Sequence, residues 1–335
     1  RVQLRLSTAK GRLEYSVTFR EKPVIETSAL GITVDKVNLA EGVQLGKVDR
    51  YQVKESYPWY GGHSTAVDHC HGVKVTVTHA ASRTGYTLEI RAYNDGIAFR
   101  HIVPGEGTRV PDEATMFRLP SGSTLWYHDF EDHYEGVYAR KGLRAVPPGG
   151  WAAPPLTFQL PGGAGYASIT EGALVNYSGM GLEGDGAGGF HVRLGHAIPA
   201  SYPFRLRYAQ DVERLSRPAA ITGTITTPWR VVMIGADLNG LVNCDIVHNV
   251  APPPDSKFFP DGLKTAWVKP GRSLWSYLDG GNNTLEGMKE FARLAAELGF
   301  EYNLLEGFWA KWPESQVKEL ADYSRERGVG IVIWR

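Results

Sequence analysis

The chain has 335 residues, 42% of them apolar, and its 36 Lys and Arg residues balance its 36 Asp and Glu residues. This length and composition predict a globular protein of about two domains. The balanced charge argues against nucleic acid or a membrane as partner, because both favour a basic surface. We expect no membrane-spanning segment and no signal peptide, since Arg1 leads directly into strand-like sequence. A processed N-terminus is compatible with the same start. Cys70 and Cys244 are too few for a disulfide framework.

Residues 1–250 predict a β-rich domain. Apolar and polar residues alternate with a period of two, as in half-buried strands, in segments 2–6, 13–19, 74–78 and 86–93. The tight turn 94–96, Asn-Asp-Gly, leads into a further strand and predicts a hairpin over 86–103. Many short antiparallel strands predict a large β-super-sandwich. No stretch before residue 283 has helical periodicity.

The part after a proline-rich linker, residues 251–263, has a different organisation. Near residue 283 the period of the apolar residues changes from two to 3.6, and strands then alternate with helices. The predicted strands are 273–278, 300–305 and 329–335. This alternation is typical of βαβ units around a parallel sheet.

Two helices separate these three strands. The first is predicted to begin with Asn283 as N-cap and Glu286 as its capping partner, and to end at Gly299. Its apolar face is predicted to contain Leu285, Met288, Phe291, Ala292, Ala295 and Leu298. The second helix is predicted to begin at Pro313 and to end at Gly328. Its inward residues are predicted to be Val317, Leu320, Ala321 and Ser324.

A sheet of three parallel strands cannot bury both of its faces. A complete (β/α)8 barrel takes roughly 250 residues, and residues 264–335 are far fewer. The predicted fold class is therefore multidomain, a β-super-sandwich followed by the first part of a (β/α)8 TIM barrel, as in the front portion of a longer enzyme.

Glu306 is the first candidate for a functional residue. It directly follows the second predicted parallel strand, where barrel enzymes place their active-site groups. Trp309, Lys311 and Trp312 belong to the same loop. A carboxylate among aromatic rings suits a sugar site, since the acid binds hydroxyl groups and the rings stack on the sugar. The alternative is a surface loop that caps a helix.

Other residues belong to the same rim of the predicted barrel. Trp275 and Tyr277 end the first strand, where alternation puts both on one face, and Asp279 follows them. They are either sugar-binding residues or packing inside the barrel. Trp334 and Arg335 end the third strand, and Arg335 is either a ligand for a sugar or carboxylate or the start of a solvated loop.

Candidates in the β-rich part carry weaker signals. His69 and His71 flank Cys70, but a strand would point them away from the cysteine and no third metal ligand is evident. The acidic aromatic segment 126–134 is predicted to be a loop, either reaching a ligand or simply exposed. Glu171 would be an ordinary strand-end acid by itself, and Arg230 is predicted to be structural.

Six segments in order along the chain resemble glycoside hydrolase family 97, whose members are α-glucosidases and α-galactosidases. They are Tyr93–Arg100, Ile169–Tyr177, Thr227–Arg230, Trp267–Pro270, Leu305–Gly307 and Gly328–Trp334. The resemblance implies an N-terminal β-super-sandwich, a catalytic (β/α)8 barrel and a C-terminal all-β domain, and so implies that most of the barrel and the last domain are absent.

The resemblance also implies roles for single residues. Glu171 matches an acid that the sandwich contributes as a calcium ligand beside the substrate, and Glu306 matches a carboxylate that contacts the sugar in the −1 subsite. The remaining substrate-binding candidates are Trp275, Tyr277, Trp309 and Lys311. The family's usual Glu-Gly-Trp has one extra residue here, before Trp309. The catalytic carboxylates are expected beyond Arg335.

The function implied is that of a calcium-dependent, exo-acting α-glycosidase with an oligosaccharide substrate, periplasmic or secreted, whose 335-residue portion alone is nearly inactive. The family contains retaining and inverting branches, and the first and third strands lean slightly towards the retaining one. A non-catalytic carbohydrate-binding β-sandwich is the alternative. A mutarotase-like sugar epimerase is the third possible function. It would need His69, His71 and Glu171 as its catalytic residues.

Overall fold

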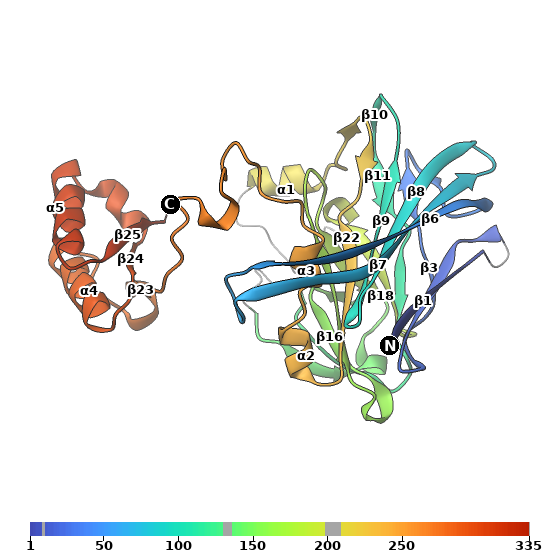
Figure 1. The fold of residues 1–335 in the computed structure, drawn as a ribbon, viewed down its shortest axis with the longest axis horizontal. Coiled ribbons are helices and arrows are strands. Elements are labelled where there is room, and N and C mark those ends of the chain that lie inside the picture. Colours follow the sequence, from blue (N-terminus) through green and yellow to red (C-terminus); the bar gives the residue numbers. More distant parts are fainter. Residues whose placement is uncertain (9–10, 130–135, 198–208, 335) are drawn as a thin grey trace. The chain divides into compact units, whose positions relative to one another are not determined.

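The chain folds into two compact units, Arg1–Pro253 and Pro254–Arg335 (Figure 1). The computed structural model describes residues 1–8, 11–129, 136–197 and 209–334. The division falls in the proline-rich segment that the sequence marks as a linker. Each unit has a hydrophobic core of its own.

The first unit consists mainly of two large antiparallel sheets. In spatial order, the seven-stranded sheet contains β1 (Val2–Ser7), β2 (Glu14–Phe19), β3 (Lys22–Ala29), β12 (Met116–Arg118), β19 (Gly189–Leu194), β18 (Met180–Gly184) and β15 (Trp151–Ala152). The ten-stranded sheet contains β14 (Ala139–Gly142), β13 (Thr124–Tyr127), β16 (Leu156–Gln159), β17 (Tyr166–Gly172), β22 (Trp229–Gly235), β9 (Gly96–Val103), β8 (Thr84–Ala92), β7 (Thr65–His79) and β6 (Val43–Pro58), with β21 (Ile225–Thr226) beside β9.

Two small sheets contain the other strands found among the described residues of this unit. One contains β11 (Pro111–Glu113), β4 (Ile32–Val34) and β5 (Val37–Asn38), and the other β10 (Thr108–Arg109) and β20 (Ile221–Thr222). Single 3₁₀ turns lie at Leu143–Ala145, Pro161–Gly163 and Gly195–Ala197.

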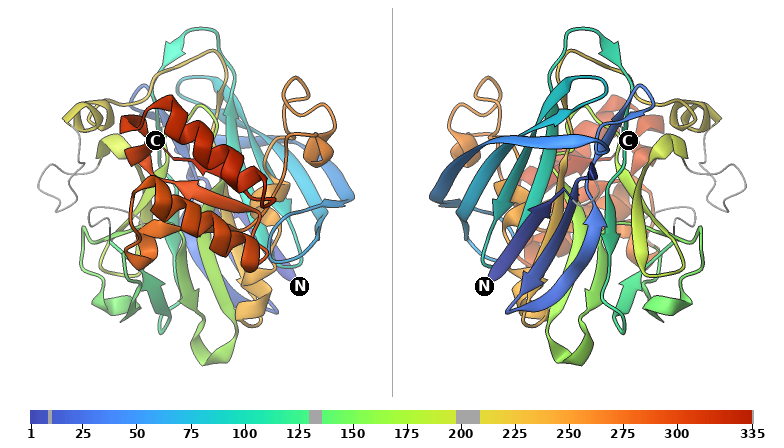
Figure 2. Two further views of the ribbon diagram at one scale, coloured as in Figure 1. Left: turned by 90° about the vertical axis from the view of Figure 1, so that its left-hand side faces the viewer. Right: turned by 90° about the vertical axis from the view of Figure 1, so that its right-hand side faces the viewer.

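The two large sheets pack face to face, as the sequence predicts for a sandwich, and Figure 2 shows β1, β2 and β3 lying across the longer sheet. Tyr15 of β2 meets Phe99 of β9 edge to face, with ring centroids 5.2 Å apart. Phe117 of β12 joins the same aromatic contact. Buried and exposed residues alternate along β7, so one face of this strand enters the interior of the unit.

The predicted hairpin over 86–103 is confirmed, because β8 and β9 pair antiparallel around the turn. Gly96 has φ +155°, and a Cβ at this position would lie 2.3 Å from the carbonyl oxygen of Val232. The turn therefore requires glycine.

Two expectations for this unit are corrected. Its described residues contain three short helices, α1 (Ala209–Leu215), α2 (Leu238–Val242) and α3 (Ile246–Asn249), where none was predicted. They are too short to produce a helical period in the sequence. The predicted loop 126–134 begins inside strand β13, and residues 130–134 lie outside the described residues.

The second unit contains the three parallel strands and two helices that the sequence predicts. Strands β23 (Ser273–Trp275), β24 (Tyr302–Leu305) and β25 (Gly330–Ile333) pair in parallel. Helices α4 (Leu285–Glu297) and α5 (Glu314–Arg325) lie side by side against this sheet (Figure 2). Further 3₁₀ turns are Gly262–Lys264, Ser276–Asp279 and Gly307–Lys311. The assignment of this sheet to a barrel stays a prediction.

Details of the predicted helices and first strand are also corrected. The first strand ends at Trp275, and the next residues form a 3₁₀ turn. The N-cap of α4 is Thr284 rather than Asn283, because the Thr284 side chain accepts a hydrogen bond from the backbone N–H of Gly287. Leu298 is 59% exposed, since α4 ends before it. Both predicted helix-ending glycines, Gly299 and Gly328, do have positive φ.

Candidate functional site

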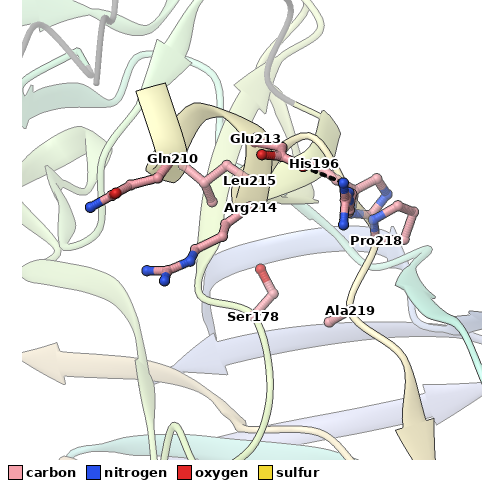
Figure 3. A pocket seen from close by; sticks show the side chains of 9 residues that line it. Ser178, His196, Gln210, Glu213, Arg214, Leu215, Pro218 and Ala219 are labelled. Carbon is pink, nitrogen blue, oxygen red and sulfur yellow. Dashed lines mark hydrogen bonds and ion pairs between the residues drawn. The ribbon is translucent and has the colours of Figure 1, made fainter. Parts of the chain in front are cut away.

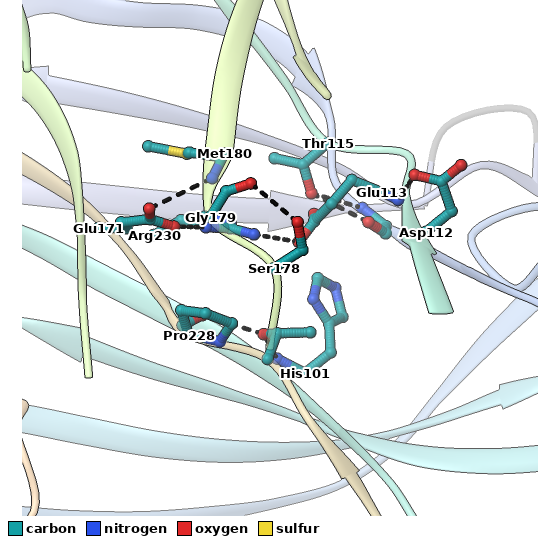
Figure 4. Close-up of polar contacts among 12 residues, drawn as sticks. His101, Asp112, Glu113, Thr115, Glu171, Ser178, Gly179, Met180, Pro228 and Arg230 are labelled. Carbon is teal, nitrogen blue, oxygen red and sulfur yellow. Dashed lines mark hydrogen bonds and ion pairs between the residues drawn. The ribbon is translucent and has the colours of Figure 1, made fainter. Parts of the chain in front are cut away.

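An Arg230 ion-pair cluster, defined as Arg230, Glu171 and Glu113, lies inside the first unit (Figure 4). Glu171 of β17 and Arg230 of β22 are directly paired across the ten-stranded sheet, so their side chains share one face. The guanidinium is 1% exposed; its Nη1 donates to Glu171 Oε2 at 2.5 Å, and its Nη2 donates to Glu113 Oε1. The predicted structural role of Arg230 agrees with this burial.

The two carboxylates of this cluster differ in exposure. The Glu113 side chain is completely buried, whereas that of Glu171 is 16% exposed. Glu171 Oε1 accepts a further hydrogen bond from the backbone N–H of Met180 at 3.2 Å. Burial raises the pKa of Glu171, and the nearby positive charge of Arg230 partly opposes that rise. Glu171 is therefore the acid of the cluster that a ligand can reach.

The cluster leaves polar atoms without partners. Glu113 Oε2, Arg230 Nε and the Tyr177 hydroxyl are buried and have no hydrogen-bond partner in the described part of the chain. Burial also raises the pKa of Tyr177 well above its ordinary value, so this hydroxyl keeps its proton. One buried cation therefore faces two carboxylates here.

A pocket of about 560 Å³ lies close to the cluster (Figure 3). Its lining includes Ser178, His196, residues of α1 and residues of the segment after α1. Ser178 Oγ accepts from the backbone N–H of Gly195 at 3.2 Å. Figure 4 shows Ser178, Gly179 and Met180 in one segment beside Glu171, so the same segment lines the pocket and contacts the carboxylate.

Calcium requires more oxygen ligands than these residues offer. The ion binds six to eight oxygens, whereas the described cluster presents one partly exposed carboxylate, and that carboxylate already pairs with the Arg230 cation. The described residues of this cluster therefore offer too few free oxygen ligands for calcium.

A second cluster lies at the carboxyl ends of the parallel strands in the second unit. Glu306 follows β24 and accepts a hydrogen bond from Trp275 Nε1 at 2.5 Å. The rings of Trp275 and Tyr277 stack, with centroids 5.1 Å apart and planes 20° apart. Three of the five substrate-binding candidates thus meet, although Tyr277 lies on the 3₁₀ turn and not on the strand as predicted.

The other two candidates lie on the 3₁₀ turn Gly307–Lys311. Trp309 packs against the buried core of the unit, and its Nε1 donates to the backbone oxygen of Trp334 at 2.9 Å. Trp309 thus supports the fold. Lys311 is exposed. The side chain of Asp279 and the whole of Arg335 lie outside the described residues.

The histidines of β7 do not join either cluster. Cys70 is buried, while His69 and His71 are exposed, as strand alternation predicts. Strands β22, β9 and β8 lie between β17, which carries Glu171, and β7. The three residues that an epimerase would have to combine are therefore not assembled into one site.

Glu113, the partner that sequence reasoning missed, has no recognisable motif. It lies in a three-residue strand and meets Arg230 from 117 positions away in the chain. A buried arginine on a core strand was the one available signal, because such a cation requires carboxylates.

Solved structures share this fold and belong to the class of glycoside hydrolases. A family 97 enzyme from a Pseudoalteromonas species, in complex with acarbose, has a TM-score of 0.79 and 23% identity, over 98% of this chain and 52% of that chain. A β-arabinopyranosidase has a TM-score of 0.81 and 19% identity, over 99% of this chain and 54% of that chain.

Residues 1–253 match the family model described as glycosyl-hydrolase 97 N-terminal, and the chain therefore belongs to glycoside hydrolase family 97. A probable retaining α-galactosidase of Streptomyces bingchenggensis is 28% identical over 99% of this chain and 50% of its own length. A retaining α-galactosidase of Bacteroides thetaiotaomicron is 24% identical, over 98% of this chain and 53% of its own length. The chain spans about half the length of the curated relatives it matches.

No helix in the described ranges combines the length and the apolar character that crossing a membrane requires.

Proposed function

We propose that the complete protein is an exo-acting retaining α-glycosidase that hydrolyses terminal α-galactosides of oligosaccharides. The observation that carries this proposal is the 28% identity, along 99% of this chain, to a protein named a probable retaining α-galactosidase. α-Glucosides are the competing substrates within the same family.

In this proposal the cluster of Glu306, Trp275 and Tyr277 contacts the sugar. The Glu306 carboxylate can accept hydrogen bonds from sugar hydroxyl groups, and the Trp275 indole N–H fixes its orientation. The Tyr277 side chain is 71% exposed, so its ring is available for stacking on a pyranose face. Such a site combines apolar stacking with a few placed polar groups, which is the usual composition of a small-molecule site.

The acid/base and the nucleophile belong, in this proposal, to the part of the enzyme beyond these 335 residues, together with the rest of the barrel and a C-terminal β domain. The 335-residue chain alone is then expected to be nearly inactive, because a positioned general acid contributes about 10²–10⁴-fold to the rate. A periplasmic or secreted location is part of the same proposal.

The test compares the complete reading frame with the 335-residue chain on nitrophenyl α-galactoside and α-glucoside. We expect turnover by the complete protein only, with a higher kcat/KM on the galactoside, and NMR should show the α-anomer as first product. A β-anomer would contradict retention. A complete protein that binds oligosaccharides without hydrolysing either glycoside would favour the carbohydrate-binding sandwich.

Calcium forms a separate part of the proposal. Glu171 would supply one ligand in the complete enzyme, and carboxylates outside this chain would supply the others. We predict weak or no calcium binding by the 335-residue chain and tight binding by the complete enzyme, because a hard divalent ion needs six to eight oxygens.

Calorimetry on the complete enzyme and its Glu171→Gln variant checks this prediction. The variant should bind calcium at least about tenfold more weakly, because it loses a charged ligand. Glu183→Gln is a matched control, since Glu183 is also a strand acid paired with an arginine, Arg193, at 2.6 Å. Equal affinity of the Glu171→Gln variant and the parent would leave Glu171 as a structural acid only.

A further inference from the structure

A histidine–aspartate cluster, His63, Asp245 and His248, joins two distant parts of the first unit. His63 lies in the loop between β6 and β7, Asp245 directly precedes α3, and His248 is in α3. The Nε2 atoms of His63 and His248 both face Asp245 Oδ1, at 2.6 and 2.8 Å. One ligand atom from each residue lies within 4.8 Å of the others.

The neighbours of this cluster hold its side chains in place. The backbone N–H of Val67 donates to Asp245 Oδ2 at 2.8 Å and orients the carboxylate. The ring of Trp59 stacks on His248, with centroids 4.0 Å apart and planes 20° apart. The exposed side-chain fractions are 11% for Asp245, 20% for His248 and 27% for His63, so the cluster is largely shielded and remains open on the side of His63.

The donor atoms indicate the class of ion. Both Asp245 oxygens are acceptors: Oδ2 accepts from the backbone N–H of Val67, and Oδ1 faces the two imidazole nitrogens. Two imidazole nitrogens and one carboxylate oxygen are the donor set of open zinc sites, whereas calcium and magnesium require oxygen ligands. The His63 Nδ1 atom is buried and has no hydrogen-bond partner within the described residues.

We propose that His63, Asp245 and His248 bind one divalent transition-metal ion of the zinc type, with water in the fourth position. On binding, each Nε2 gives up its proton, either to solvent or to Nδ1 of the same ring, and its lone pair binds the ion. Tetrahedral ligands at about 2.0 Å from zinc lie about 3.3 Å apart. The present separations of 2.6 and 2.8 Å therefore have to widen by about 0.7 and about 0.5 Å.

The ion would fasten the end of the β6–β7 hairpin to α3. Strand β6 is exposed along almost its whole length, with Val43 as its one buried residue. The end of this hairpin is therefore held by the buried residues of β7 and by polar contacts, among them those of His63 and Val67 to Asp245. This site and its role are independent of the glycosidase proposal.

The test titrates zinc chloride into the metal-free 335-residue chain by calorimetry. We expect one bound ion with a micromolar or lower Kd. His63→Gln and His248→Gln should each weaken binding at least about 100-fold, beyond what the loss of a supporting residue usually costs. Each glutamine keeps an N–H donor for Asp245, so the hydrogen-bonded contact can survive while the metal ligand is lost. His71→Gln, which changes an exposed histidine of β7, should leave the affinity unchanged.

Hydrogen exchange provides a readout on the unaltered chain, which applies even if a variant does not fold. Zinc should slow the exchange of the Val67 amide at least tenfold, because the ion locks its acceptor Asp245. Three results would each overturn the proposal: no bound zinc, an unchanged exchange rate of the Val67 amide, or variants that bind zinc as tightly as the parent. The three residues would then form a hydrogen-bonded contact only.

Discussion

Arg230 is the buried cation that pairs with Glu113 and Glu171 inside the sandwich. Removing one partner of a buried ion pair leaves an uncompensated charge, which costs about 3–5 kcal/mol. We therefore expect Arg230→Met to lower the free energy of unfolding by about that amount, because Glu113 and Glu171 would lose the cation that both face. Urea unfolding of the 335-residue chain measures the change.

Arg193→Met is the matched control for this prediction. Arg193 also pairs with a strand acid, Glu183, but its side chain is 40% exposed. Exposed pairs contribute about 0–1 kcal/mol, so the control should change stability little. Equal effects of the two substitutions would show that burial does not determine the contribution of Arg230.

His101 gives the first unit a pH dependence. Burial, followed by the positive charge of Arg230, lowers the pKa of His101 to about 3, and the ring of Tyr86 lies beside it. The unfolded chain binds this proton near pH 6.5, so the folded state binds fewer protons than the unfolded state between these values. Stability from this group is complete above pH 6.5 and is lost as the pH falls towards 3.

The measurement is the free energy of unfolding as a function of pH. The contribution of His101 should amount to roughly 3–5 kcal/mol over the whole window. His101→Gln should flatten the decline, whereas substitution of the exposed His71 should not. If the free energy of unfolding of the His101 variant declines as steeply as that of the parent, other titrating groups cause the decline.

At the scale of elements, the cap of α4 distinguishes two neighbouring residues. Thr284, not Asn283, accepts the hydrogen bond from Gly287, at 3.1 Å. Loss of such a cap costs about 1 kcal/mol. Thr284→Ala should therefore destabilise α4 by about 1 kcal/mol, as measured by native-state hydrogen exchange of its amides. Asn283→Ala should change the opening free energy of the same amides by less than about 0.5 kcal/mol. A larger effect of Asn283→Ala than of Thr284→Ala would show that Asn283 is the cap.

The sequence predicts those elements whose signals are local. The turn at Gly96 identifies the β8–β9 hairpin, and the glycines at 299 and 328 identify the helix ends. The choice between Asn283 and Thr284 cannot be predicted, since both are good caps and only the backbone dihedral angles decide. Glu113 could not be predicted because its contact with Arg230 depends on the assembled fold. Trp275 and Glu306 could be placed at one rim, since parallel strands end on the same side of a sheet.

At the scale of the whole molecule, two sheet edges differ in their chemistry. Strand β6, the edge of the ten-stranded sheet, carries Lys47, Arg50 and Lys54 and has an irregularity in its pairing near Leu45. Charges and bulges of this kind prevent edge-to-edge association. Strand β25, the edge of the parallel sheet, has the uncharged sequence Gly330–Ile333, and its Ile333 is 50% exposed.

We therefore expect the 335-residue chain to self-associate through β25. Sedimentation velocity should show a weight-average mass that increases with concentration, and Ile333→Lys should reduce this increase because the charge opposes strand pairing. Val48→Lys, an equivalent change on the β6 edge, should have little effect. A monomer at all concentrations would contradict the expectation.

The order of strands in the seven-stranded sheet has a consequence for the time course of folding. Strand β3 pairs with β12 through Glu26 and Arg118, and this pairing closes a loop of about 90 residues. The β8–β9 hairpin and the second unit instead pair segments that are close in the chain. Closing long loops is slow because chain entropy is lost before contacts form. In pulse-labelling hydrogen exchange, the amides of β8 and β9 should gain protection before those of β12, and simultaneous protection would contradict this order.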